Sequence, residues 1–227
     1  KAGASQPYLH LPELNQRNYQ TVLLDKIDSA AAEGELHVYN FTAVTEKGEI
    51  TTRSYIVEVS RTITFTKISL GNQNSTSTGS FFAAASGRVF GKTTPDSNAV
   101  LIDMVYYHSA QSGSPLFANG ATLAAPADPT AQTAFTEITA WPVRNQTEFR
   151  ELGNTLALFN DATTSAKIRA AFGTSPGSNS LTNLTTGTVF GFKTENGKYG
   201  IARVTLLTTP NVITNIGAIR LDVRVER

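Results

Sequence analysis

The stretch TVFGFKTENGKYGIARVTLL (residues 188–207) contains two strand-like runs that meet at Asn196-Gly197. Asn and Gly tolerate a positive φ, so this dipeptide is the strongest signal in the chain for a β-hairpin closed by a tight two-residue turn. Further along, residues 216–225 (IGAIRLDVRV) alternate apolar and charged side chains, as a half-buried antiparallel strand requires. The C-terminal part of the chain is therefore predicted to be β-structure.

A second hairpin with the same turn chemistry is predicted over residues 36–59. There LHVYNFTAVT runs up to the turn EKG (46–48), and TTRSYIVEV returns from it. Alternation places Tyr39 and Phe41 on one face, where we expect them to enter a core. Both turns carry the frame F-x-x-x-T-E-x-G, which we interpret as convergent turn chemistry because the flanking residues do not continue the match.

The strand pattern restarts at residue 62 with TITFTKISL, which indicates a domain boundary near Ser60. A chain of 227 residues is long enough for two β domains that bury adequate cores without disulfides or metals. We therefore predict a mainly β protein with two β domains, residues 1–60 and residues 61–227. The second is predicted to be a β-sandwich or a β-barrel-like domain that also contains two short α-helices.

The most apolar run of the chain is AVLIDMVYY (residues 99–107). Continuous hydrophobicity without alternation is typical of a strand that is covered on both faces, so we expect this run at the centre of a sheet. Residues 108–142 contain repeated Gly and Pro, which prevent long regular elements. That stretch is predicted to be a long loop across the surface.

The first helix is predicted near residues 147–159. Asn145 or Thr147 can cap a helix over residues 148–159, and the acidic residues of its first turns suit the positive end of the helix dipole. Its apolar stripe would comprise Phe149, Leu152, Leu156 and Phe159.

The second helix is predicted near residues 164–172, with the sequence SAKIRAAF over residues 165–172. Thr163 or Thr164 can cap its N-terminus. Gly173 follows directly, and glycine is the residue expected where a helix ends in a left-handed conformation.

The composition of the chain limits which partners, metals and cofactors it can be expected to bind. The formal net charge of +1 provides no field for nucleic acid or anionic lipid, so we expect no nucleic-acid partner. The chain has no cysteine, which excludes disulfides and thiolate chemistry. No apolar run approaches the roughly 18 residues of a membrane span, and the sequence shows neither a dense acidic calcium loop nor a Gly-rich phosphate loop. We expect no transmembrane segment, no metal and no cofactor.

The sequence contains no recognisable catalytic frame. The three histidines stand in unrelated contexts, and only His108, at the end of the predicted central strand, lies where a pocket could open. Asp103 interrupts the apolar run and must be hydrogen-bonded or paired if it is buried. One interpretation is a pocket carboxylate of a hydrolase that acts on polysaccharide together with a second carboxylate. The other is a structural carboxylate that binds backbone amides.

Glycan binding by β proteins uses exposed aromatic rings that stack on sugars. The only tryptophan, Trp141, precedes Pro142 at the end of the predicted loop, and it is either a ligand platform or a core plug. The other aromatic candidates are Tyr106, Tyr107, Phe117 and Tyr199. Together with His108 and Asp103, the residues Trp141, Tyr106 and Tyr107 form the predicted ligand-binding set.

Several segments, in this order, resemble a group of uncharacterised secreted or lipid-anchored surface proteins of Bacteroidetes. They cover most of residues 62–227. They are SFF (80–82) up to Gly87, IDMVYY (102–107), ATLAAP (121–126) with Asp128, the helical stretch that ends in IRAAF (168–172), and VFGFKTENGKYG (189–200) leading to IRLDVRV (219–225).

The first 60 residues look like the terminal F-G hairpin of an immunoglobulin-like domain, on the segments YNF (39–41), EKG (46–48) and YIVEV (55–59). Such a domain needs about 100 residues, so the resemblance implies that it is incomplete here.

The resemblance also implies an exported protein at the cell surface or in the periplasm, either secreted or attached to the membrane by a lipid anchor. Because the N-terminus KAGASQPY has no apolar h-region, an exported protein would be present here in its mature form without a signal peptide. We therefore expect a non-enzymatic surface or adhesion module that binds a glycan or a protein. The alternatives are the Asp103 hydrolase and a purely structural spacer, which would have neither a sizeable pocket nor an exposed aromatic cluster.

Overall fold

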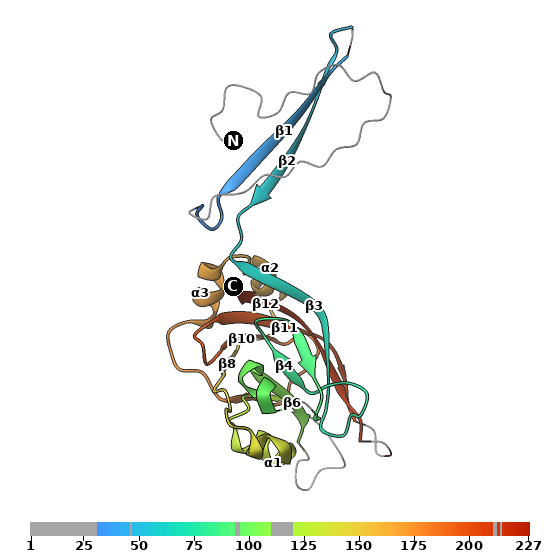
Figure 1. Ribbon diagram of the computed structural model, residues 1–227, viewed down its shortest axis with the longest axis vertical. Helices are drawn as coiled ribbons and strands as arrows, with labels where there is room; N and C mark the ends of the chain where they lie inside the picture. Colours follow the sequence, from blue (N-terminus) through green and yellow to red (C-terminus); the bar gives the residue numbers. More distant parts are fainter. Residues whose placement is uncertain (1–30, 46, 94–95, 110–119, 211–212, 214) are drawn as a thin grey trace. The chain divides into compact units, whose positions relative to one another are not determined.

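The fold is mainly β, as predicted. The computed structural model describes residues 31–45, 47–93, 96–109, 120–210, 213 and 215–227. The chain divides into two compact units, Lys1–Ser60 and Arg61–Arg227. The described residues form one two-stranded sheet in the first unit and two five-stranded sheets in the second, and all strand pairs are antiparallel (Figure 1).

In the first unit, β1 (Leu36–Val44) and β2 (Ile50–Glu58) form the predicted hairpin. The prediction that Phe41 enters a core is wrong: its side chain is 44% exposed and packs edge-on against Tyr55, with 5.5 Å between the ring centroids. The described residues of this unit form a single two-stranded sheet, which supplies no second layer to cover the ring. The immunoglobulin-like assignment stays a prediction, because residues 1–30 lie outside the described residues.

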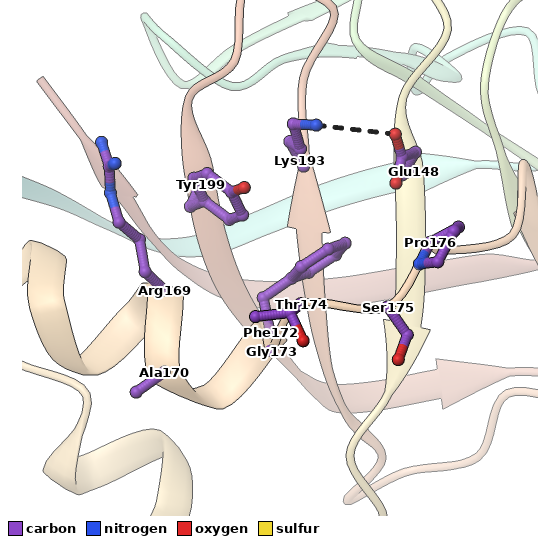
Figure 2. Close-up of a pocket in the computed structure, with 10 residues that line it drawn as sticks. All are labelled: Glu148, Arg169, Ala170, Phe172, Gly173, Thr174, Ser175, Pro176, Lys193 and Tyr199. Carbon is purple, nitrogen blue, oxygen red and sulfur yellow. Dashed lines mark ion pairs between the residues drawn. The ribbon is translucent and has the colours of Figure 1, made fainter.

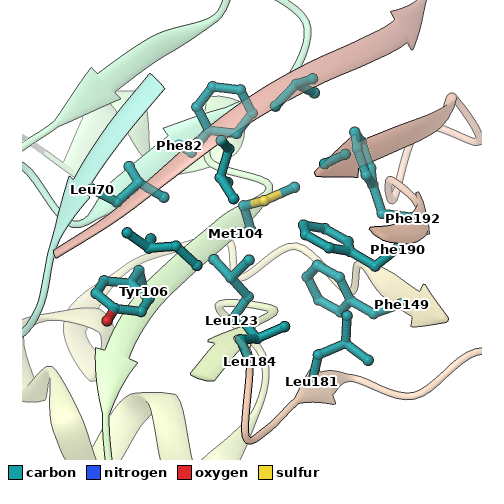
Figure 3. Close-up of a cluster of buried hydrophobic side chains, with 14 of the residues drawn as sticks. Leu70, Phe82, Met104, Tyr106, Leu123, Phe149, Leu181, Leu184, Phe190 and Phe192 are labelled. Atoms are coloured by element: carbon teal, nitrogen blue, oxygen red, sulfur yellow. The ribbon is translucent and has the colours of Figure 1, made fainter. Parts of the chain in front are cut away.

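The second unit is a sandwich of two sheets, with the strand orders β3-β12-β11-β10-β8 and β5-β4-β6-β7-β9. Side chains from both sheets meet in one apolar core, among them Phe82 and Met104 from one sheet and Phe190 and Phe192 from the other (Figure 3). The strands are β3 (Thr62–Gly71), β4 (Phe81–Ala83), β5 (Arg88–Phe90), β6 (Met104–His108), β7 (Ala121–Ala124), β8 (Glu148–Glu151), β9 (Ser180–Leu181), β10 (Val189–Lys193), β11 (Tyr199–Thr208) and β12 (Ala218–Glu226).

Strand β12 confirms the amphipathic strand predicted near the C-terminus. Its apolar side chains are buried on one face, and its charged side chains point the other way. The buried residues are Ile219, Leu221, Val223 and Val225.

The hairpin of β10 and β11 is also present, but its turn has three residues rather than two. The Gly197 amide donates to the Thr194 carbonyl, and the Thr194 amide donates to the Lys198 carbonyl, each at 2.9 Å. Gly197 has a φ of 73°, whereas Asn196 is not in the positive region. This is a three-residue loop ending in a left-handed glycine, which suits the twist of the strands.

The first hairpin closes in the same way, so the shared turn chemistry is confirmed. The Gly48 amide donates to the Thr45 carbonyl and the Thr45 amide donates to the Glu49 carbonyl, again at 2.9 Å each, with a φ of 81° at Gly48. In both turns the threonine hydroxyl also accepts an amide hydrogen bond, from Glu49 in one and from Lys198 in the other.

The predicted central strand is present at the expected place in the sheet, but it is shorter than predicted. Strand β6 lies in the middle of its sheet and is buried along its whole length, as predicted. The residues before it form a 3-10 helix, η1 (Asp96–Leu101), instead of continuing the strand. The Ile102 amide donates to the Ala99 carbonyl at 3.1 Å and closes this turn, so Asp103 precedes the strand rather than interrupting it.

The helix predicted over residues 148–159 is wrong in its first half. Residues Glu148–Glu151 are strand β8, which pairs with β10, and helix α2 (Leu156–Asp161) begins only afterwards. Gly153 has a φ of 78°, which a right-handed helix cannot accommodate. Phe149 therefore faces the sandwich core as a strand residue, while Leu156 is exposed.

The predicted second helix is confirmed as α3 (Ser165–Phe172). The Thr164 side chain accepts from the Lys167 amide, and Gly173 ends the helix with a φ of 75°. Thr164 therefore caps the helix as predicted. Gly173 has the positive φ that favours glycine, but its ψ of −171° differs from the left-handed helical conformation that the sequence analysis expected.

The prediction of a surface loop over residues 108–142 is wrong for its described part. Residues 120–142 include the fully buried strand β7, helix α1 (Pro129–Ala134) and the 3-10 helix η2 (Thr136–Ala140). The Asp128 carboxylate caps α1, and Pro129 occupies the first helical position, where its missing amide is no disadvantage. The proline that suggested a loop thus starts a helix.

The helices lie on the outer faces of the sandwich. Helices α1 and η2 cover the outer face of the β6 sheet, in a second apolar cluster that includes Tyr107 and Trp141. Helices α2 and α3 cover β10 and β11 on the outer face of the other sheet, in a third cluster that includes Val189 and Ile201.

Candidate functional site

Trp141 is a core residue. Only 3% of it is exposed, and its ring packs edge-on against Phe81 with 5.2 Å between centroids. A sugar cannot stack on a ring that is covered by Phe81 and the η2 segment, so the geometry matches the core-plug alternative.

Tyr106 and Tyr107 are buried on opposite faces of β6, in the first and second apolar clusters respectively. Burial raises the pKa of Tyr107 to about 12, and the nearby Asp128 carboxylate adds to this effect. Burial also raises the pKa of Tyr106, whose hydroxyl has no hydrogen-bond partner among the described residues. The two rings are not available as a platform for a sugar.

The surroundings of Asp103 match a structural carboxylate and not a pocket carboxylate of a hydrolase. It is 5% exposed, and its Oδ2 accepts a hydrogen bond of 2.7 Å from the Ala84 amide. Burial raises the pKa of this carboxyl to about 6, and the amide hydrogen bond opposes the rise only in part. A sealed carboxylate bound to a backbone amide is the arrangement that the hydrolase hypothesis does not allow.

His108 is also enclosed, with 1% exposure, and burial lowers the pKa of its imidazole. Its backbone is held on both sides by one side chain: Gln73 Oε1 accepts from the His108 amide at 2.9 Å, and Gln73 Nε2 donates to the His108 carbonyl at 2.8 Å. The predicted set of Trp141, Tyr106, Tyr107, His108 and Asp103 is therefore not gathered around an open pocket.

A surface depression of about 650 Å³ lies elsewhere, between the end of α3 and the hairpin of β10 and β11 (Figure 2). The chain enters it at Gly173, where α3 ends, and follows its rim to Pro176. Its lining residues are Glu148, Arg169, Ala170, Phe172, Gly173, Thr174, Ser175, Pro176, Lys193 and Tyr199.

Tyr199 is the aromatic centre of this depression. Its ring is half-buried and meets Phe172 edge-on, with 5.3 Å between centroids. The Arg169 guanidinium lies 5.2 Å from the centroid of the Tyr199 ring, and the Lys193 ammonium lies 5.9 Å from it. Tyr199 is thus the one of the aromatic candidates from the sequence that lines the depression. Another of those candidates, Phe117, lies outside the described residues.

The register of the hairpin brings Lys193 to this ring. Lys193 and Tyr199 are directly opposite each other on β10 and β11. A two-residue turn would have paired Lys193 with Gly200 instead, so the three-residue loop at Gly197 determines this juxtaposition.

Arg169 is fixed by an ion pair with Glu226. Its Nε and Nη2 donate to the two carboxylate oxygens at 2.5 and 3.0 Å, and this contact raises the pKa of Arg169. Glu226 is nearly buried and also accepts from the Tyr199 amide at 3.2 Å. The carboxylate therefore holds both the cation and the backbone of the aromatic residue.

Arg150 on β8 holds the rim of the depression in place. Its Nη2 donates to the carbonyls of Ser175 and Pro176, and its guanidinium lies 5.2 Å from the centroid of the Phe172 ring. A Cβ atom added to Gly173 would lie 3.0 Å from Arg150 Nη1, so a glycine suits this position for space as well as for its φ.

The sequence named Tyr199 as an aromatic candidate and Gly173 only as the end of a helix, and it did not point to Arg169, Lys193 or Glu226. The three residues come from α3, β10 and β12. The available signal was the hairpin itself, because the correct turn type would have placed Lys193 opposite Tyr199.

In the described part of the chain, no group of three or more His, Cys, Asp or Glu side chains is placed to hold a metal ion. Nor does any helix in these residues have the length and apolar character to cross a membrane.

No protein-family model matches the chain, and no curated protein matches it. Among solved structures, it is similar to the apo form of the HmuY analog of Tannerella forsythia, over 85% of this chain and 95% of that one. The identity is 12% and the TM-score 0.17, values too low to support an argument about fold or function.

Proposed function

We propose that this chain is a non-enzymatic binding module that holds a carbohydrate in the depression beside Tyr199. The observation that carries the proposal is the half-buried Tyr199 ring in a depression of about 650 Å³, a volume typical of small-ligand sites. The spacer alternative predicts neither a sizeable pocket nor an accessible aromatic ring.

The chemistry of the lining suits a sugar. A sugar ring presents a C–H face that packs on an aromatic ring, and hydroxyl groups at its edge that need hydrogen-bond partners. Around Tyr199 the depression offers the hydroxyls of Thr174 and Ser175 and the charged groups of Lys193 and Glu148. The exposed rim at Thr174 and Ser175 leaves room for an oligosaccharide to extend beyond a single sugar unit.

We also propose that the protein is exported and lies at the cell surface or in the periplasm, secreted or attached through a lipid anchor. This rests on the hydroxyl-rich composition and on the resemblance of residues 62–227 to surface proteins of Bacteroidetes.

The experiment is a glycan array probed with the wild-type chain, Tyr199→Ala and Tyr55→Ala. Tyr55 is an exposed tyrosine of the first unit, outside the depression, and serves as the matched control. We expect wild type and Tyr55→Ala to bind the same glycans and Tyr199→Ala to lose them while it remains folded at the assay temperature. Tyr199→Ala is expected to melt somewhat below wild type, because the Tyr199 ring packs against Phe172. An array on which the wild-type chain binds nothing would overturn the proposal.

A protein partner is the second candidate function. Apolar side chains are exposed on the first hairpin, and the register of β1 and β2 places five of them on one face. A pull-down with wild type and with Val38→Thr/Ile56→Thr tests this candidate, which predicts a partner that only the wild-type chain retains. The five residues are Leu36, Val38, Val44, Ile50 and Ile56.

A further inference from the structure

We infer that the ligand of this depression is an acidic carbohydrate, in which a sugar carboxylate pairs with Lys193 while a sugar ring packs on Tyr199. The inference rests on the proposed function and adds the chemical class of the sugar. It depends on how the cations around the depression are already engaged.

Arg169 and Arg150 are both committed to the protein. Arg169 binds Glu226 through two hydrogen bonds, of 2.5 and 3.0 Å. Arg150 donates to the carbonyls of Ser175 and Pro176 and so holds the rim in place. Recruiting either guanidinium for a ligand would break contacts that shape the depression.

Lys193 is not held in this way. Its Nζ lies 3.7 Å from Glu148 Oε1, which is too far for a hydrogen bond, and 5.9 Å from the centroid of the Tyr199 ring, at the outer limit of a cation–π contact. Glu148 itself accepts a hydrogen bond of 3.0 Å from the Gly177 amide through its other oxygen. Among the lining cations, the Lys193 ammonium therefore keeps its hydrogen-bonding capacity for an incoming group.

The position of Lys193 also suits an anionic sugar. It stands opposite Tyr199 in the sheet register, so its ammonium reaches the edge of any sugar ring packed on that tyrosine. Lys193 has Glu148 as its counter-ion at 3.7 Å, as the dashed line in Figure 2 shows, but makes no hydrogen bond to it. A ligand carboxylate can supply the charge-assisted hydrogen bond that this ion pair lacks, and such a bond is stronger than one to a neutral hydroxyl. A uronate carries such a carboxylate directly on its ring.

The test is calorimetric titration of the full chain with two oligosaccharides, an oligogalacturonate and a galacto-oligosaccharide of the same length, whose units carry CH₂OH in place of the carboxylate. We expect the acidic ligand to bind about fivefold more tightly at low salt, and the difference to shrink as salt is raised. Lys193→Gln is expected to remove this preference, so that the acidic and the neutral ligand bind with similar affinity. Tyr199→Ala is expected to weaken binding of both.

Lys198→Gln is the matched control, because Lys198 lies on the same hairpin but does not line the depression. If the two ligands bind equally and Lys193→Gln changes neither affinity, the acidic class is wrong while carbohydrate binding stands. If Lys198→Gln removes the preference as fully as Lys193→Gln, the effect is one of general charge and the inference is overturned. Absence of binding by both ligands, together with an empty glycan array, removes the proposed function itself.

Discussion

At the scale of single residues, Asp103 makes the stability of the protein depend on pH. Burial raises the pKa of its carboxyl from 3.8 to about 6 in the folded state. Between these values the folded chain binds the proton more tightly than the unfolded chain does. The contribution of this group to stability is therefore complete below about pH 4 and is lost as the pH rises through 6.

Replacing Asp103 by Asn tests this directly, because the amide oxygen can still accept from the Ala84 amide but cannot ionise. We expect the stability of Asp103→Asn relative to wild type to increase by roughly 2–3 kcal/mol between pH 4 and pH 8. Urea unfolding at a series of pH values measures the difference. Asp96→Asn is the control, since Asp96 is exposed nearby, and parallel pH profiles for wild type and Asp103→Asn would show that the carboxyl is not perturbed.

Gly197 and Asn196 differ in importance, although the sequence presents them as one signal. Only Gly197 has a positive φ, so Gly197→Ala is expected to destabilise the fold by about 1–2 kcal/mol, and Asn196→Ala by less than about 0.5 kcal/mol. No atoms lie within 4 Å of the position of an added Cβ at Gly197, so the effect isolates backbone strain. Chemical unfolding measures both variants. Equal losses for the two would mean that Asn196 shares the strained conformation.

At the scale of elements, helix-capping residues and helix-breaking glycines decided which of the two predicted helices was correct. Helix α3 could be predicted to the residue because Thr164 and Gly173 mark its ends by local chemistry. The helix proposed before it failed because residues 149, 152, 156 and 159 also fit a strand followed by a short helix. Gly153, whose φ is 78°, separates the strand from the helix. Because glycine has no side chain, a hydrophobic pattern does not reveal this break.

Strand β7 was missed for a different reason. Its sequence ATLA is short and small, and the cues for strands favour bulky and β-branched residues. Its burial comes from the sheet and from the α1 and η2 segment that covers it, which are tertiary features.

The candidate site, like strand β7, depends on tertiary contacts that local sequence patterns do not reveal. Tyr199 could be named from the sequence as an aromatic candidate. Its partnership with Arg169 and Glu226 could not, because those residues lie on α3 and β12, which the fold brings to one end of the hairpin. Lys193 is an intermediate case, since the turn type alone decides whether it faces Tyr199 or Gly200.

At the scale of the whole molecule, the apolar cores that the described residues form belong to one unit. Each of the three hydrophobic clusters draws its members only from residues of Arg61–Arg227. The first strand of that unit, β3, is an edge strand paired with β12, and the Arg227 amide donates to the Arg61 carbonyl at 2.8 Å. The unit is therefore closed by contacts between its own two ends.

These contacts predict that residues 61–227 fold without the preceding 60. We expect a fragment of residues 61–227 to unfold in one cooperative transition, with a melting temperature within a few degrees of the main transition of the full chain. By contrast, a fragment of residues 1–60 is expected to show no cooperative transition, because its described residues form a single two-stranded sheet with exposed apolar side chains. Calorimetry of the two fragments and of the full chain makes the comparison. A cooperative transition in the 1–60 fragment would show a core of its own and would support an independent immunoglobulin-like domain, whereas an unfolded 61–227 fragment would mean that the sandwich depends on the first unit.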